Sequence, residues 1–273
     1  MDLGLDNVRF PLLDHGYVQL VESWGSDEQI IRSARMSTAK GFLGWGPKCR
    51  ACGDAFDGPE RDCPDHIVGR PYVDCGRGGH MFDAPGDEKL LKFLWDNQHS
   101  TPFEFAGMTI EVKAPIMVLR EWMRHRTQSF SEMSARYTPL PNENYIPSIE
   151  RLMVNSKTNK QAGTIKGAEE LTEEWATRFR RILEDQYVNA EDLYQHALQG
   201  GVPKELARLI VPVGRYSVMR ASTDLRNWCG FIKLRSAPNA QWEIRQYSNV
   251  VASLIKEAFP RTYEVAKSSL GLE

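Results

Sequence analysis

Long apolar runs are absent from this sequence of 273 residues, and none approaches the roughly 20 residues that a membrane-spanning helix needs. The first ten residues, MDLGLDNVRF, also lack the basic start and the apolar core of a secretion signal. We therefore expect a cytoplasmic protein that has no membrane partner.

An excess of positive charge is absent as well. The net charge is -2 at pH 7, and 41% hydrophobic and 26% charged residues are ordinary proportions for a soluble globular protein. Proteins that bind nucleic acids or membrane surfaces are usually basic overall. We therefore expect no stable nucleic-acid partner, and any polyanionic ligand would need a local cluster of basic side chains.

The sequence contains none of the common phosphate-loop or nucleophile motifs. Neither GxGxxG nor GxxxxGK[ST] occurs, and GRGG at 76–79 is more typical of a flexible loop than of a phosphate cradle. If a dinucleotide binds, arginines and helix ends must hold it, and the fold is not a Rossmann domain. The GxSxG motif is missing too, so the sequence does not indicate an activated serine.

Cysteine is scarce and unevenly distributed. Five cysteines, an odd number, do not indicate a secreted disulfide scaffold. Four of them lie between Cys49 and Cys75, in a stretch at 41–85 that is rich in Gly, Pro and Asp and lacks periodicity. This stretch predicts an inserted loop or minidomain within one domain that spans residues 1–273.

Part of the insertion resembles a zinc knuckle, because Cys49-x2-Cys52 is followed after ten residues by Cys63-x2-His66. Paired ligands on tight turns can close a tetrahedron, and thiolates with one imidazole suit a structural zinc. A loop with free thiols fits the pattern equally well. Two later residues are alternatives for the fourth ligand: Cys75 and His80.

Outside the insertion, alternating and helical patterns predict an α/β fold. Strands are expected at 16–23, 107–113 and 216–222. Helices are expected after the cap Ser26, at 87–99, from Pro115 in a first turn, at 170–198, after Thr223 or Asp224, and finally at 239–259. The helix at 170–198 is amphipathic, and its expected inward residues are Trp175, Phe179, Ile182, Tyr187, Leu193 and Tyr194.

Basic residues gather in the stretch 120–137, REWMRHRTQSFSEMSARY, where Arg124-His125-Arg126 is followed after seven residues by Ser134. Four arginines lie in this stretch, and planar guanidinium groups bind phosphate bidentately. The cluster therefore indicates a polyanion site. Cations at a helix end are the alternative, but that alternative explains Arg124 and Arg126 alone.

Three further arginines lie among apolar neighbours: Arg208 in ELARLIV, and Arg226 and Arg235 in DLRNWCGFIKLR. Each by itself is more typical of a long side chain that reaches the surface. Together with the cluster at 120–137, they favour one shared pocket for a ligand that carries phosphate.

These ordered motifs resemble those of the flavin-dependent thymidylate synthases, the ThyX family. The family signature is matched by Arg124-His125-Arg126 with Ser134, and it continues through Ala135-Arg136-Tyr137. Further segments that match are HSTPFE at 99–104, VKAPI at 112–116, VPKELAR at 202–208, LR at 234–235 and AQWEI at 240–244. The resemblance covers nearly the whole chain outside 41–85.

The resemblance implies an enzyme that methylates carbon 5 of deoxyuridylate, with methylenetetrahydrofolate as carbon donor, bound FAD as redox carrier and NADPH as reductant. It implies an α/β domain with a mixed or antiparallel sheet flanked by long helices. Family members are homotetramers whose active sites lie between subunits. A flavin suits the sequence because the cofactor performs the hydride chemistry while the protein supplies position and charge. The family uses no protein nucleophile, so Cys229 has no such role.

Site residues follow from the resemblance position by position. FAD contacts are implied for Ser37, His99, Thr101, Arg124, His125, Arg126, Glu132, Asp224, Arg226 and Gly230. Nucleotide contacts are implied for Glu121, Arg124, Glu132, Ser134, Ala135, Arg136, Arg208 and Arg235. Arg235 matches the catalytic arginine that stabilises uracil ionised at ring nitrogen 3, where a fixed cation also polarises carbon 5.

Three positions depart from the family pattern. Glu121 replaces the usual glutamine beside the nucleotide, and Asp224 and Gly230 each replace an asparagine. A carboxylate at Glu121 would repel phosphate or change the contacts to the base or the sugar. UMP as substrate, or a hydroxymethyl product, therefore stays open beside the conversion of dUMP to dTMP.

A nucleic-acid-binding protein with a zinc knuckle is the alternative from a different functional class. In that case the arginine cluster would contact a phosphate backbone. The acidic net charge argues against this alternative, and the ordered family motifs argue against it more strongly.

Overall fold

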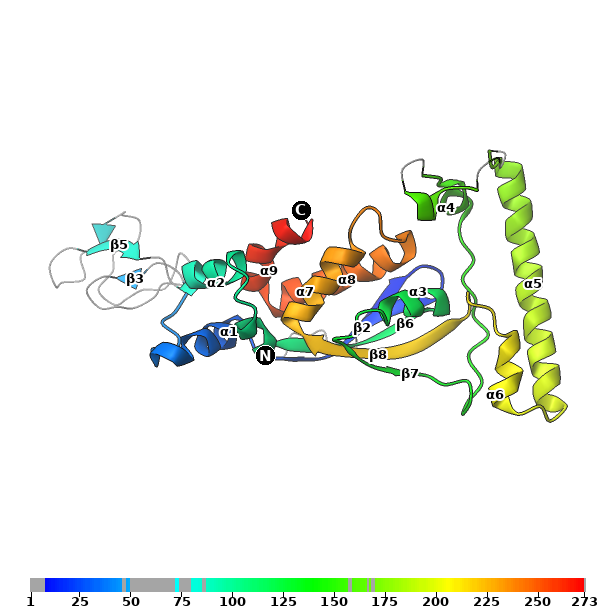
Figure 1. Cartoon of the computed structure of the whole chain (residues 1–273), viewed down its shortest axis with the longest axis horizontal. Coiled ribbons are helices and arrows are strands. Elements are labelled where there is room, and N and C mark those ends of the chain that lie inside the picture. Colours follow the sequence, from blue (N-terminus) through cyan, green and yellow to red (C-terminus); the bar gives the residue numbers. More distant parts are fainter. Residues whose placement is uncertain are drawn as a thin grey trace. The chain divides into compact units, whose positions relative to one another are not determined.

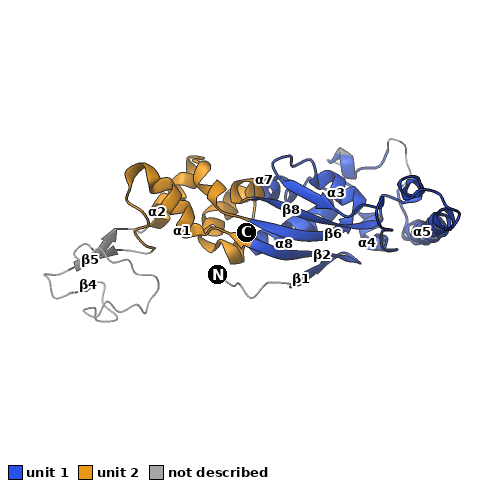
Figure 2. Cartoon of the chain, turned by 90° about the horizontal axis from the view of Figure 1, so that it is seen from below, with its two compact units in different colours: residues 1–22, 108–223, 230–254 blue, residues 23–107, 224–229, 255–273 orange. Residues whose placement is uncertain are grey.

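The structure is a computed structural model that describes residues 8–45, 48–49, 72–73, 80–84, 87–156, 159–165, 167 and 170–272, with the backbone alone at 48–49, 72–73, 80–84 and 160. The chain divides into two compact units (Figure 2). Unit 1 comprises residues 1–22, 108–223 and 230–254, and unit 2 comprises residues 23–107, 224–229 and 255–273. The expected single domain with an insertion stays a prediction.

The main sheet has five strands in the order β1, β2, β6, β8, β7. Their bounds are β1 (Arg9–Leu12), β2 (Gly16–Trp24), β6 (Gly107–Pro115), β7 (Ser129–Glu132) and β8 (Tyr216–Asp224). Both edge strands pair antiparallel with their neighbours, β1 with β2 and β7 with β8. The three predicted strands are the three central ones, and the predicted α/β fold is confirmed.

A close approach between a helix and the sheet fixes the core of unit 1. The hydroxyl of Tyr247, in α8 (Trp242–Ala258), donates a hydrogen bond of 2.9 Å to the main-chain carbonyl of Lys113 in β6. A Cβ on Gly16 would lie 2.2 Å from that hydroxyl and 2.9 Å from the same carbonyl. Glycine at position 16 therefore lets α8 pack directly on the sheet.

The other helices of unit 1 are labelled in Figure 1. They are α3 (Ile116–Trp122), α4 (Ile149–Met153), α5 (Glu173–Gln199) and α6 (Lys204–Ala207), with the 3-10 turns η3 (Lys160–Ala162) and η4 (Arg208–Ile210). Pro115 is the N-cap of α3 rather than a residue of its first turn. Helix α7 (Leu225–Arg235) follows β8 directly, and of the two caps that the sequence allows, Thr223 and Asp224, it is Asp224 that accepts from the main-chain N–H of Asn227.

The inward face predicted for α5 was wrong in most of its residues. Of the six residues predicted to face inward, only Tyr194 is fully buried within the chain, while Trp175 is 53% exposed and Leu193 is 57% exposed. The physical reason is that α5 lies at the periphery of unit 1, where it contacts α4, α6 and η4 (Figure 1). Three other members of the expected face are also exposed or half-buried: Phe179, Ile182 and Tyr187.

Unit 2 is mainly helical. It contains α1 (Asp27–Ala34), η1 (Arg35–Thr38), α2 (Asp87–Asp96), η2 (Thr101–Phe105), α9 (Pro260–Ala266) and η5 (Lys267–Leu270). A small sheet of β3 (Lys48–Cys49), β5 (His80–Ala84) and β4 (Tyr72–Val73) falls in the predicted insertion. Ser26 caps α1 as expected, because its hydroxyl accepts from the main-chain N–H of Gln29 at 3.1 Å.

The helix predicted at 239–259 is not the last one, which corrects the sequence interpretation. It ends near Pro260 as expected, but Pro260 then begins α9. A proline in the first turn of a helix loses no hydrogen bond, so it can end one helix and begin the next. In the described part of the chain, no helix combines the length and the apolar character that a membrane crossing requires.

Candidate active site

A buried tryptophan fixes the segment that follows α3. The indole N–H of Trp122, which is fully buried, donates to the side-chain oxygen of Gln128 at 3.0 Å. The indole also stacks on Phe231 of α7 at a centroid distance of 4.5 Å. The hydroxyl of Thr223 donates to the carbonyl of Thr127 at 3.1 Å. Residues 123–128, which contain the RHR motif, are therefore held at both ends.

Arg235, the last residue of α7, is bound by three hydrogen bonds. Its Nε donates to Nε2 of His125 at 2.9 Å. One terminal nitrogen donates to the carboxylate of Glu121 at 3.3 Å, and the other donates to the main-chain carbonyl of Glu121 at 2.9 Å. A guanidinium has five N–H groups, so two remain available for a ligand. The side chain is only 17% exposed, which fixes its direction.

His125 is uncharged at neutral pH. Burial lowers the pKa of the imidazole, and the charge of Arg235 lowers it further, to about 4. Because Nε2 accepts the hydrogen bond from Arg235, the proton of the neutral ring lies on Nδ1. The histidine of the RHR motif thus orients Arg235 without adding charge.

A pocket of about 520 Å³, which we call the Arg235 pocket, opens beside this arginine. The lining side chains come from α3 and the turn after it, from η3, and from the end of α7 and the loop after it: Arg120, Glu121, Arg124, Gln161, Leu234, Arg235, Asn239, Ala240 and Gln241. Three arginines against one glutamate make the pocket electropositive. Such a pocket suits a ligand that carries negative charge or develops it.

A second pocket, of about 630 Å³, lies along the loop after β7, and we call it the Ser134 pocket. Its lining includes five predicted nucleotide contacts: Glu132, Ser134, Ala135, Arg136 and Arg208. The hydroxyl of Ser134 accepts from the main-chain N–H of Arg136 at 3.4 Å and from its Nε at 3.3 Å. The structure therefore brings these positions together although Arg208 is far from the others in the sequence.

Several arginines around the two pockets have no carboxylate partner among the residues that the structure describes. Four of them line the pockets, namely Arg120, Arg124, Arg136 and Arg208, while Arg126 lines neither pocket and follows Arg124 on the same loop; all five are exposed. Clustered cations without counter-charges repel each other, so an anionic ligand would stabilise the arrangement.

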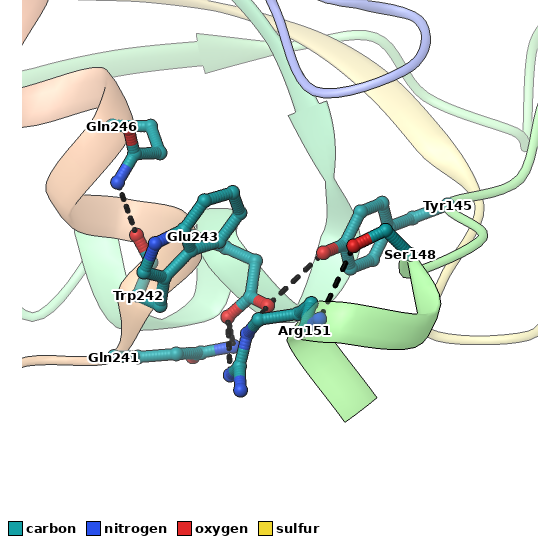
Figure 3. A network of polar contacts seen from close by, with 7 residues as sticks. All are labelled: Tyr145, Ser148, Arg151, Gln241, Trp242, Glu243 and Gln246. Carbon is teal, nitrogen blue, oxygen red and sulfur yellow. Dashed lines mark hydrogen bonds and ion pairs between the residues drawn. The ribbon is translucent and has the colours of Figure 1, made fainter. Parts of the chain in front are cut away.

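A buried carboxylate, that of Glu243, holds a residue that lines the Arg235 pocket, and Figure 3 shows its polar contacts. Glu243 accepts hydrogen bonds from Tyr145 at 3.1 Å, from Arg151 at 2.7 Å and from the side-chain amide of Gln241 at 2.9 Å. Burial is the largest single effect and acts to raise the pKa of Glu243, but the hydrogen bonds from Arg151, a main-chain N–H and Gln241, with the charge of Arg151, together outweigh it and the pKa is lowered. The ionised carboxylate therefore holds Gln241 in place.

The sequence model of the family described as thymidylate synthase complementing protein matches residues 19–261. The chain belongs to this family. It is 34% identical to the flavin-dependent thymidylate synthase of Thermus thermophilus over 260 residues, which are 95% of this chain and 78% of the relative. It is 31% identical to that of Thermosipho africanus over 257 residues, which are 94% of this chain and 93% of the relative.

Solved structures show a similar fold. The chain resembles the UMP/dUMP methylase PolB from Streptomyces cacaoi bound with 5-Br dUMP, with a TM-score of 0.69 and 28% identity. That likeness covers 95% of this chain and 97% of the PolB chain. The PolB structure bound with 5-Br UMP is similar to the same degree, with a TM-score of 0.69 and 27% identity.

Half of the FAD contacts predicted from the family resemblance lie in unit 2: Ser37, His99, Thr101, Asp224 and Arg226. The carboxylate of Asp224 accepts from the main-chain N–H of Asn227 at 2.9 Å and from its side-chain amide at 2.7 Å. This cap gives the aspartate a local role at a position where the family resemblance leads us to expect asparagine. Arg226 pairs with Glu104 at 2.5 Å.

Gly230, the other departure from the family pattern on α7, lies in unit 1 and is exposed. A Cβ at this position would meet no atom within 4 Å. No packing contact within the described residues therefore requires a glycine here, and a larger side chain would have room.

The zinc prediction falls on residues that the structure does not cover. Cys52, Cys63 and His66 lie outside the described residues, as do Cys75 and the side chains of Cys49 and His80. Within the described ranges, no three potential metal-binding side chains come together.

Arg120 and Gln241 line the Arg235 pocket although no motif indicated a role for either residue. Arg120 borders both pockets, and the only signal for it was its place in the stretch of four arginines. Gln241 lay within the matched AQWEI segment and makes a local hydrogen bond to Glu243, but only the fold brings it into the same pocket as Arg120 and Arg235.

Proposed function

We propose that this protein is a flavin-dependent thymidylate synthase that converts dUMP to dTMP. It would take the carbon from methylenetetrahydrofolate and the reducing electrons from NADPH by way of bound FAD. The observation that carries the proposal is a set of exposed arginines around two pockets, for which the described residues supply no carboxylate partner, in a chain of the thymidylate synthase complementing family. FAD and a nucleotide together supply several phosphates, which such arginines bind.

The residues present fit a flavin dinucleotide. Arg124 and Arg126 are exposed cations on a loop whose ends are fixed, so their guanidinium groups can bind a diphosphate with little loss of freedom. When bound, the flavin supplies the hydride chemistry, and the protein supplies orientation and charge. Arg124, which also lines the Arg235 pocket, would connect the flavin side with the nucleotide side.

The nucleotide would use both pockets. Arg136 and Arg208 in the Ser134 pocket would bind its phosphate, with the hydroxyl of Ser134 as a further contact. The uracil ring would meet the two available N–H groups of Arg235. A guanidinium fixed in advance stabilises negative charge that develops on the ring at no cost of reorganisation, which activates carbon 5.

The buried cysteine supports a mechanism without a protein nucleophile. Cys229 is 3% exposed, and burial, with a smaller effect from Asp224, raises the pKa of its thiol to about 12. A neutral, inaccessible thiol cannot attack a pyrimidine ring, since the thiolate is the nucleophilic form. This agrees with transfer of the carbon by way of the flavin.

We further propose a homotetramer whose active sites lie between subunits. The predicted nucleotide contacts of one chain divide between the Ser134 pocket and the Arg235 pocket. In the assembly, the Ser134 pocket of one subunit would lie against the Arg235 pocket of its neighbour, and the two together would form one complete site. Exposed Trp175, Ile182 and Leu193 on α5 offer apolar area for subunit contacts. Sedimentation analysis tests the assembly, and a stable monomer would contradict it.

UMP is a second candidate substrate, because PolB, which the chain resembles over 95% of its length, is described as a UMP/dUMP methylase. A carboxylate at Glu121 could accept a hydrogen bond from a ribose hydroxyl that dUMP lacks. A hydroxymethyl product belongs to the same alternative. Competition between dUMP and UMP in one reaction, with the products identified by mass, separates these possibilities.

The first test of the proposal is optical. The purified protein should be yellow, absorb near about 450 nm and oxidise NADPH only when flavin is present. Colourless protein that FAD cannot reconstitute would contradict the proposed function. A structural zinc bound by Cys49, Cys52, Cys63 and His66 is proposed separately, and metal analysis of the purified protein tests it.

A further inference from the structure

A lysine of α6 contacts the loop that follows β7. The loop at 134–140 begins where the main-chain N–H of Met133 donates to the carbonyl of Val218 at 2.8 Å. Beyond that point, one hydrogen bond joins the loop to another segment of the described chain: the ammonium group of Lys204 donates to the main-chain carbonyl of Tyr137 at 2.9 Å. This contact holds the exposed middle of the loop against α6.

The loop itself is a tight turn. The main-chain carbonyl of Ser134 accepts from the N–H of Tyr137 at 2.9 Å and from that of Thr138 at 3.2 Å. The hydroxyl of Ser134 accepts from the main-chain N–H and from Nε of Arg136. Because these bonds connect Arg136 to Tyr137 through Ser134, a bond that fixes the carbonyl of Tyr137 also restricts the guanidinium of Arg136.

On the other side of the contact, Lys204 precedes Arg208 by one helical turn. The main-chain N–H of Arg208 donates to the carbonyl of Lys204, as in an α-helix, and side chains four residues apart lie on the same helix face. The Nε of Arg208 donates to the carbonyl of Glu205 at 3.3 Å. The ammonium group of Lys204 thus connects the segment that carries Arg208 with the loop that carries Arg136.

This connection opposes a repulsion between charges. Arg136 and Arg208 line the Ser134 pocket, both are exposed, and the described residues supply no carboxylate partner for either. Like charges that face one pocket repel each other, so the two segments would separate more easily without the contact. Lys204 itself does not line the pocket, so its effect on a ligand passes through the arginines.

We propose that Lys204 is a positioning residue that ties the loop at 134–138 to α6 and so sets Arg136 and Arg208 at the separation that binds one phosphate group. This inference rests on the proposed function, since it takes the ligand to be a nucleotide monophosphate. Two cations fixed in advance bind an anion more tightly than mobile ones, because less conformational freedom is lost on binding.

The first test compares two ligands that differ by the phosphate group, dUMP and deoxyuridine, on FAD-loaded protein. Lys204→Met keeps the length of the side chain and removes the donor and the charge. Its affinity for dUMP should fall about tenfold, while its affinity for deoxyuridine should not change. An unchanged affinity for dUMP, or an equal loss for both ligands, would overturn the proposal.

A double-mutant cycle with Arg208→Ala separates positioning from direct contact. If Lys204 acts through the two arginines, Lys204→Met should weaken dUMP binding much less in the Arg208→Ala protein than in wild type. Losses that simply add would show that Lys204 binds the phosphate independently, and they would overturn the positioning role. Lys204→Arg keeps a cation that can donate to the same carbonyl, so it should restore most of the affinity.

Stability and flavin content serve as controls. Lys204 is exposed, so Lys204→Met should keep the melting temperature and the flavin absorbance of wild type. The matched control is Lys89→Met, an exposed lysine of α2 outside both pockets, which should bind dUMP as wild type does. If wild type itself does not bind dUMP, the proposed function fails. If wild type binds dUMP and Lys204→Met binds it equally well, the positioning role alone fails.

Discussion

Arg235 donates from Nε to Nε2 of His125 across 2.9 Å, and this contact joins the end of α7 to the RHR motif. The motif histidine therefore serves as a neutral acceptor, while the arginines that flank it remain exposed. A sequence pattern that first indicates a cluster of cations thus contains two kinds of residue. Arg124 and Arg126 are available to a ligand, and His125 orients a catalytic candidate from a distant helix.

Replacement of Arg235 by alanine should abolish methylation and leave the flavin bound. The variant loses the fixed cation beside the ring, and removing one such donor typically costs about a hundredfold or more in rate. Turnover and absorbance near about 450 nm are measured on the same sample. Arg220→Ala, an exposed arginine outside both pockets, is the control and should retain wild-type turnover. Normal turnover of Arg235→Ala would remove this residue from the mechanism.

Arg208 should contribute mainly to binding of the nucleotide. Its exposed guanidinium lines the Ser134 pocket, and a charge-assisted hydrogen bond to phosphate is worth about 1.5 to 3 kcal/mol. Arg208→Ala should therefore raise KM for the nucleotide by roughly ten- to a hundredfold and change kcat less. Steady-state kinetics with varied dUMP measure both constants, and Arg32→Ala, in α1 of unit 2, is the control. An unchanged KM would exclude a contact between Arg208 and phosphate.

The neutral state of His125 predicts a loss of stability in acid. Its pKa is about 4 in the folded chain and 6.5 in the reference state, so the unfolded chain binds the proton more readily. The contribution of His125 to the free energy of unfolding is fully present above pH 6.5 and is lost as the pH falls toward 4. His125→Gln stays neutral, so its melting temperature should fall less than that of wild type over this window. Parallel curves for the two proteins would show that the imidazole is not held neutral.

The buried ion pair of unit 1 should matter for stability. Arg215 is 0% exposed and pairs with Glu191 of α5 at 2.6 Å. Arg215→Met would leave the buried carboxylate without its partner, which costs about 3 to 5 kcal/mol. Arg220→Met breaks an exposed pair and should cost about 1 kcal/mol or less. Urea unfolding measures the free energy of unfolding of both variants. Equal losses would contradict the larger contribution expected of the buried pair.

Local chemistry made much of the fold predictable. Strands β2, β6 and β8 alternate in burial, and the caps Ser26 and Asp224 are visible as short polar residues before apolar periodic segments. The edge strands β1 and β7 have only four residues each, too few for a clear alternation. The burial of α5 could not be predicted from its sequence, because its apolar residues are exposed where the helix lies at the periphery of its unit.

The candidate site was predictable in its residues but not in its contacts. The motif and the resemblance select Glu121, His125 and Arg235, yet no pattern in the sequence indicates that they bind each other. These contacts depend on the packing of α7 on the segment after α3, which Trp122 and Phe231 determine. Sequence spacing does not report packing between segments more than a hundred residues apart.

The most direct test of the central claim is identification of the product by mass. Protein loaded with FAD is incubated with NADPH, dUMP and methylenetetrahydrofolate that carries a labelled methylene carbon. The account predicts dTMP with the label in its 5-methyl group, formed only when flavin and NADPH are both present. Unchanged dUMP with a fully flavin-loaded, folded protein, and no methylated product from UMP either, would contradict it.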